Sequence, residues 1–184
     1  MNYTCHSGGC PGSDMKWENE GNKYGVKTIA YSFWGHTQEG KNRQILTDEE
    51  LAEGFEAVKI ASKGIKRDPN PRWPYVKNLI CRNWFQVKNA ESVFAVGKFI
   101  SEKLVSGGTG WAVQMSVDNK KPTFVFDQVN NNWNKFNYDL DKFEVIDYIP
   151  KLTENFAGVG TREINDNGNK AIETILKNNF GVLV

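Results

Sequence analysis

The chain has 184 residues, and its 23 Lys and Arg residues nearly balance its 22 Asp and Glu residues. A hydrophobic share of 39% excludes a disordered chain, and this length suits a single domain over residues 1–184. The sequence has no apolar run long enough for a membrane helix and no leader typical of secretion, and its net charge of +1 argues against general nucleic-acid binding.

Along the chain, short apolar runs alternate with longer helical patterns, which is typical of an α/β fold with a mainly parallel sheet. The clearest helix starts after Thr47, because Thr47 and Glu50 form a capping box before an apolar run. In chain order, we expect strands at 2–6, 26–33, 93–96, 123–127, 144–149 and 156–159, helices at 14–24, from 47, at 76–85, 111–117 and 167–178, and loops at 66–74, 119–122 and 130–134.

The three cysteines, Cys5, Cys10 and Cys81, do not suggest a disulfide framework. A reduced, cytoplasmic location is therefore expected. Cys5, His6 and Cys10 crowd one segment without a second cluster to complete a zinc site, so no metal is expected.

Glycine-rich turns recur at three equivalent places, between an expected strand and an expected helix. Glycine lets a ligand approach the backbone, and helix N-termini favour phosphate. In a parallel sheet such turns meet at one edge, so together they predict a phosphate or ribose site, although any one of them could be only a tight turn. None fits a dinucleotide fingerprint or a P-loop. The turns lie at Ser7–Asp14, Ser106–Gly110 and Gly158–Glu163.

The first turn and its surroundings resemble the SLOG superfamily, whose members include DprA, YspA-like proteins and the LOG phosphoribohydrolases. The family turn Ser-Gly-Gly-x-x-Gly-x-Asp matches at Ser7, Gly8, Gly9, Gly12 and Asp14. Arg82-Asn83 and Gly107–Gly110 resemble the family's arginine-bearing helix and second phosphate loop. The resemblance implies a Rossmann-like three-layer sandwich that binds a phosphorylated nucleotide, needs no further cofactor, and forms a homodimer or higher homo-oligomer.

Two features depart from this family. The unit Phe156–Glu163 resembles the family's first strand and turn but comes last, which predicts a circular permutation with residues 156–159 beside residues 2–6 in the sheet. In addition, Gln114 occupies the position of the glutamate that supports base–ribose cleavage in LOG enzymes. Glutamine cannot act as a general base, so the resemblance favours nucleotide binding over hydrolysis.

Individual residues carry alternatives. Asp14 either contacts ribose or caps a helix, and Trp34 and Trp133 either stack on a base or are partly buried. Cys10 could be a nucleophile only with a base, for which His6 and His36 are the only histidines. The expected ligand- and phosphate-binding residues are Ser7, Gly8, Gly9, Gly12, Ser13, Asp14, Arg82, Asn83, Gly107, Gly108, Thr109, Gly110, Gln114, Gly160, Thr161 and Arg162.

Three functions follow as hypotheses. The first is a non-catalytic sensor or sequestering protein for an NAD- or ADP-ribose-derived nucleotide or a nucleoside phosphate, and the resemblance also suggests a role against anti-phage defence signalling. The second is a nucleotide N-glycosidase or phosphoribohydrolase that uses Asp14 or Glu163. The third is DprA-like binding of single-stranded DNA, which the balanced charge disfavours.

Overall fold

A computed structural model of the chain describes residues 2–181 and has one sheet of eight strands. The strand order is β3-β2-β1-β8-β4-β5-β6-β7, and all neighbours pair in parallel except β5–β6 and β6–β7. The strands are β1 (Thr4–Ser7), β2 (Lys27–Phe33), β3 (Arg43–Leu46), β4 (Ser92–Gly97), β5 (Thr123–Asp127), β6 (Asn132–Asn137), β7 (Lys142–Ile146) and β8 (Asn155–Gly160).

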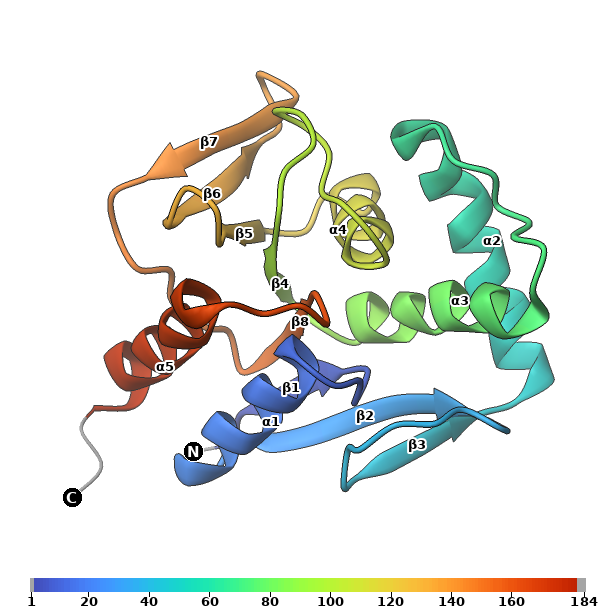
Figure 1. Cartoon of the computed structure of the whole chain (residues 1–184), viewed down its shortest axis with the longest axis horizontal. Coiled ribbons are helices and arrows are strands. Elements are labelled where there is room, and N and C mark those ends of the chain that lie inside the picture. The colour runs from blue at the N-terminus through green and yellow to red at the C-terminus, as the bar shows by residue number, and fades with distance from the viewer. Residues whose placement is uncertain (1, 182–184) are drawn as a thin grey trace.

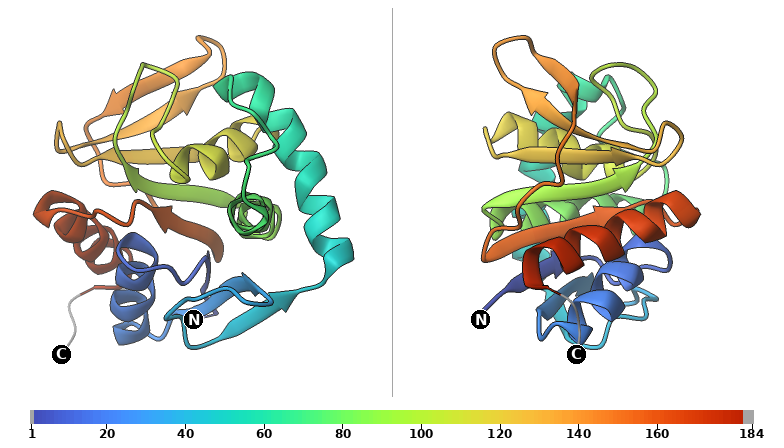
Figure 2. Two further views of the ribbon diagram at one scale, coloured as in Figure 1. Left: turned by 45° about the vertical axis from the view of Figure 1, so that its right-hand side comes forward. Right: turned by 90° about the vertical axis from the view of Figure 1, so that its left-hand side faces the viewer.

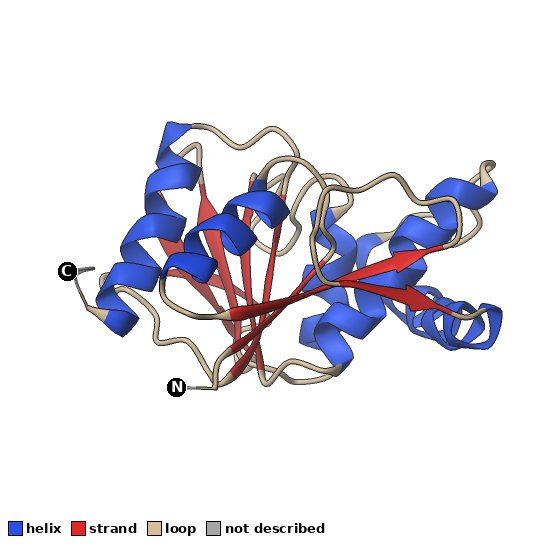
Figure 3. Cartoon of the chain, turned by 90° about the horizontal axis from the view of Figure 1, so that it is seen from below, coloured by secondary structure: helices blue, strands red, loops and turns tan. Residues whose placement is uncertain are grey.

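Helices cover both faces of this sheet (Figures 1 and 3). On one face, α1 and α5 pack together, while α2, α3 and α4 pack on the other (Figure 2). The helices are α1 (Ser13–Lys23), α2 (Asp48–Ile65), α3 (Pro74–Lys88), α4 (Thr109–Asp118) and α5 (Asp166–Phe180). The expected α/β class with a mainly parallel sheet is thus confirmed, and the layering is consistent with a Rossmann-like sandwich.

The core is divided by the sheet because successive side chains of a strand point to opposite faces. In β4, Phe94 and Val96 pack toward α1 and α5, in a cluster that contains Trp17 and Ile172. Val93 and Ala95 of the same strand pack in the other cluster, with residues of α2, α3 and α4. Because β4 is buried on both faces, its residues 93–96 form a continuous apolar run, which made the strand predictable.

The sequence predicted all five helices and six strands near their observed bounds. The capping box is confirmed: Thr47 Oγ1 accepts a hydrogen bond from Glu50 N at 3.2 Å, and Glu50 Oε2 accepts one from Thr47 N at 2.8 Å. Two strands were missed. The prediction of a loop at 130–134 is wrong from residue 132 on, because Asn131, at φ +55°, closes a hairpin into β6. The edge strand β3 is short and mostly exposed, so it lacks an apolar run.

The first and the last strand of the chain, β1 and β8, lie side by side in the middle of the sheet. β8 pairs in parallel with β1, with Cys5 opposite Phe156 and His6 opposite Ala157. This is the adjacency that the permutation hypothesis requires, and the permutation itself stays a prediction. Over residues 2–181, the structure contains no helix with the length and apolar character needed to cross a membrane.

Candidate functional site

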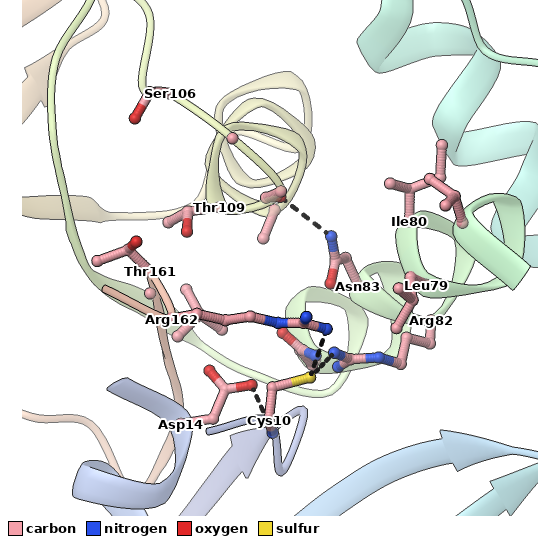
Figure 4. Close-up of a pocket in the computed structure, with 17 residues that line it drawn as sticks. Cys10, Asp14, Leu79, Ile80, Arg82, Asn83, Ser106, Thr109, Thr161 and Arg162 are labelled. Atoms are coloured by element: carbon pink, nitrogen blue, oxygen red, sulfur yellow. Dashed lines mark hydrogen bonds between the residues drawn. The ribbon is translucent and has the colours of Figure 1, made fainter. Parts of the chain in front are cut away.

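A cavity of about 380 Å³ lies at the carboxyl ends of β1, β8 and β4 (Figure 4). The helices that follow β1 and β8 cover one face of the sheet, whereas the helix that follows β4 covers the other. Such a switch point between neighbouring parallel strands is where open α/β sheets bind ligands. All three predicted glycine-rich turns reach this cavity. It is lined by Cys10, Asp14, Val76, Leu79, Ile80, Arg82, Asn83, Gln86, Ser106, Gly107, Gly108, Thr109, Ala112, Val159, Gly160, Thr161 and Arg162.

Arg82 of α3 is the most informative side chain in the cavity. It is only 5% exposed, yet just one of its three nitrogens is satisfied: Nη2 donates to Cys10 Sγ at 3.1 Å. Nε and Nη1 are buried and have no hydrogen-bond partner within residues 2–181. Arg162, which is exposed, points toward the same sulfur, with Nη2 4.0 Å from Cys10 Sγ (Figure 4). A buried cation with unused donors is costly unless an anion completes its contacts.

The second turn presents backbone to the cavity. Gly107 and Gly108 line it, and a Cβ added to either would meet no atom within 4 Å. Gly108 is the N-cap of α4, and no side chain caps this helix. The first N–H groups of an α-helix have no intrahelical partner and carry a partial positive charge. Arg82 and the start of α4 therefore place positive charge on the lining of the same cavity.

Four other glycines of the three turns make room for neighbouring protein atoms. A Cβ on Gly8 would lie 1.8 Å from Arg82 Nη1, and one on Gly12 would lie 2.3 Å from the carbonyl oxygen of Arg162. Gly160 and Gly110 are similarly closed off by the carbonyls of Val96 and Val105, at 2.5 and 2.1 Å. These glycines therefore let Arg82 and the turns pack closely, while Gly160 also lines the cavity, and their part in ligand binding stays a prediction.

Asp14 is the only carboxylate that lines the cavity within the described chain. Its Oδ2 accepts a hydrogen bond from Cys10 N at 3.3 Å, and Gly12 rather than Asp14 is the N-cap of α1. Burial raises the pKa of this carboxyl to about 6, although the neighbouring Arg82 charge opposes the rise. Asp14 is therefore mostly protonated below about pH 6.

His36, from the loop after β2, lies beside Cys10. Its Nε2 is 3.8 Å from Cys10 Sγ, its Nδ1 is 3.0 Å from Ser32 Oγ, and its ring stacks on Phe33. Burial lowers the pKa of His36 to about 4, and the positive charges of Arg82 and Arg162 contribute. The sequence named His36 as one possible base but gave no sign of this contact, because the loop folds back through tertiary packing.

The lowered pKa of His36 predicts acid sensitivity. In the unfolded chain His36 binds a proton below about pH 6.5, whereas in the folded chain it binds one only below about pH 4. The free energy of unfolding therefore falls as the pH is lowered from about 6.5 to 4. Asp14 acts oppositely, because its raised pKa makes stability fall as the pH rises from about 4 to 6.

We expect His36→Gln to remove this loss of stability in acid. The free energy of unfolding of the variant minus that of the wild type should therefore rise by about 2 kcal/mol when the pH is lowered from 7 to 4.5. Urea unfolding of both proteins at the two pH values checks this, and a constant difference contradicts it.

Several predicted residues lie outside the cavity. Ser7 and Ser13 are buried and donate to the carbonyls of Gly158 and Thr161, so they join the turns together. Gln114 packs against Gly64 of α2 and bonds Asp118, which corrects its expected place at the ligand. The exposed Glu163 and the turn residues Gly8, Gly9, Gly12 and Gly110 are also absent from the lining.

The two tryptophans expected to stack on a base do not line the cavity. Trp133 is 7% exposed and packs edge-on against Phe126 in the core, so the base-stacking prediction for it is corrected. Trp34 is 91% exposed at the turn after β2. An apolar wall at the cavity comes instead from Val76, Leu79 and Ile80 of α3, with Ala112 of α4.

Taken together, fold and cavity define an α/β protein with an arginine-lined pocket at the switch point of its sheet. Comparisons with protein-family models, with curated proteins and with solved structures gave no match for this chain. Within residues 2–181, no three His, Cys, Asp or Glu side chains gather closely enough to hold a metal ion.

Proposed function

We propose that this chain binds a small phosphorylated nucleotide in the cavity between β1, β8 and β4, with the phosphate at Arg82 and the start of α4. The observation that carries the proposal is the buried guanidinium of Arg82: this residue lines the cavity, and its Nε and Nη1 have no hydrogen-bond partner in the described chain. A guanidinium donates charge-assisted hydrogen bonds to phosphate, and an uncapped helix N-terminus supplies further donors. A few such donors suffice, which agrees with a net charge of only +1.

The rest of the cavity suits the other parts of a nucleotide. Its volume of about 380 Å³ lies within the range of small-molecule sites. Val76, Leu79 and Ile80 offer an apolar wall for a base, while Asn83 and Thr109 supply polar groups for a ribose. Nucleoside phosphates and ADP-ribose-like molecules share this combination of anion, polar sugar and flat apolar base.

The turn sequences and the pairing of β1 with β8 support a circularly permuted member of the SLOG class. With Gln114 turned toward α2, the cavity lacks a counterpart of the LOG glutamate at that position. We therefore propose a protein that senses or sequesters its nucleotide.

The proposal is tested by denaturing the purified protein and analysing the released small molecules by mass spectrometry. Thermal unfolding is then followed with nucleoside monophosphates, NAD and ADP-ribose. An intact released nucleotide, or a rise in melting temperature with one of these ligands, supports binding. If neither occurs, the proposal fails. Salt-sensitive oligonucleotide binding would favour the DNA-binding hypothesis instead.

Gly108→Ala tests whether a ligand approaches the start of α4. Gly108 has φ −65° and open space around it. Alanine is a poorer N-cap residue than glycine but restricts the unfolded chain, and these opposing effects should change stability by less than about 1 kcal/mol. We expect nucleotide affinity to fall by about 10-fold or more, because the methyl group would separate phosphate from the backbone N–H groups. Calorimetric titration of both proteins measures this. Unchanged affinity would place the phosphate elsewhere.

Asp14 favours a second candidate function, cleavage of the base–ribose bond. A carboxyl group with a pKa of about 6 is protonated in mildly acidic solution, and its remaining protonated fraction near pH 7 can protonate a leaving base. Incubation with nucleoside monophosphates, NAD and ADP-ribose distinguishes the two functions: a free base that accumulates with time supports the glycosidase, and an intact ligand supports the binder.

A further inference from the structure

The three cysteines occupy very different surroundings. Cys5 and Cys81 are buried in the cores on the two faces of the sheet, and burial raises the pKa of Cys81 to about 11 and that of Cys5 still further. Cys10 is also buried, at 7% exposure, but it lines the cavity. The chain therefore contains one cysteine at the site and two internal controls.

Three side-chain nitrogens lie around the sulfur of Cys10. Arg82 Nη2 lies at 3.1 Å, His36 Nε2 at 3.8 Å and Arg162 Nη2 at 4.0 Å. The two arginines attract an anionic reagent to this sulfur, and the thiolate is the nucleophilic form of cysteine. A second observation points to a ligand beside this sulfur: Arg82 lines the same cavity, and its buried Nε and Nη1 have no hydrogen-bond partner in the described chain. An anion held by Arg82 would thus lie next to a nucleophile.

We propose that Cys10 is a site of covalent modification, selective for small carbon electrophiles that carry a carboxylate or a phosphate. The arginines would hold the anionic group of the reagent while the sulfur attacks its carbon. The site goes beyond nucleotide binding and does not depend on it, because any small anion that enters the cavity meets the same two arginines, Arg82 and Arg162.

With iodoacetate as the probe, the thiolate sulfur attacks the CH₂ carbon, an S–C bond forms, the C–I bond breaks, and iodide leaves with the electron pair. The product is S-carboxymethylcysteine. The thiol proton passes to solvent, since His36, whose pKa is lowered to about 4, does not retain it near neutral pH. The new carboxylate stays beside Arg82 and Arg162, which stabilise it.

The experiment compares iodoacetate with its neutral analogue iodoacetamide on the intact chain, and peptide mapping identifies the modified cysteines. We expect Cys10 to be modified while Cys5 and Cys81 remain free. Positive charge concentrates anions locally, so the iodoacetate-to-iodoacetamide rate ratio at Cys10 should exceed that of the urea-unfolded chain by about 10-fold or more. Inorganic phosphate should slow the iodoacetate reaction.

Arg162→Gln supplies the variant, because Arg162 is exposed and its replacement should not disturb folding. It should reduce the rate ratio, whereas Arg72→Gln, which changes an exposed arginine outside the lining, should not. An unreactive Cys10, a ratio equal to that of the unfolded chain, or equal effects of the two variants would overturn the proposal. Because no nucleotide is used, these outcomes are separate from those that test nucleotide binding.

Discussion

Arg82→Met should lower nucleotide affinity at least about 100-fold while leaving the free protein as stable as the wild type, or more stable. Two charge-assisted hydrogen bonds, each contributing about 1.5–3 kcal/mol, are lost from the complex. The free protein loses a buried cation whose Nε and Nη1 bond nothing in the described chain. Methionine fills a similar volume without that desolvation cost, and Asp14, deprived of its cationic neighbour, can stay protonated.

The sign of the stability change is what separates a ligand-binding arginine from a structural one. Urea unfolding of the free proteins and calorimetric titration with the nucleotide found by mass spectrometry give the two quantities. Arg72→Met is the control, since this exposed arginine stacks on Trp73 and should affect neither. If Arg82→Met instead destabilises the free protein by more than about 2 kcal/mol, Arg82 supports the fold and the proposed phosphate site loses its main argument.

Most of the fold could be predicted from the sequence because its central strands are buried on both faces. β4 and β5 contain the apolar runs 93–96 and 124–126, and the prolines of residues 66–74 predicted the connection between α2 and α3, although Pro74 itself is the first residue of α3. The strands β3 and β6, near the edges of the sheet, could not be predicted from the sequence. β3 is mainly exposed and β6 begins within an asparagine run, so their strand structure depends on pairing with neighbours rather than on local sequence.

The location of the candidate site could also be predicted, because three turns after parallel strands must meet at one edge of the sheet. The roles of individual residues at the site could be predicted less well. That Gly8 makes room for Arg82, while Gly108 stays open, depends on contacts between segments far apart in the chain. The approach of His36 to Cys10 depends on how the loop after β2 folds back. Glycine spacing alone therefore cannot distinguish a ligand-binding glycine from one required for packing.

The largest expected effect on stability is at Gly12, a glycine required for packing. Gly12→Ala should destabilise the protein by about 3 kcal/mol or more. Gly12 has φ +91° and ψ −128°, a conformation that L-residues avoid, and the new Cβ would lie 2.3 Å from the backbone oxygen of Arg162. Backbone cannot move aside as a flexible side chain would, so the turns after β1 and β8 must separate.

Gly25→Ala is the matched control. Gly25 also has a positive φ, +76°, but a Cβ there meets no atom within 4 Å, so only the conformational penalty of about 1 kcal/mol should appear. Urea unfolding measures both variants. Separation of the turns would also stretch the hydrogen bonds from Ser13 N and Oγ to Thr161 O, which hold Cys10 and Arg162 at one cavity. Gly12→Ala should therefore weaken nucleotide binding, and Gly25→Ala should not. Equal losses of stability in the two variants would show that the contact between these turns is looser than the structure indicates.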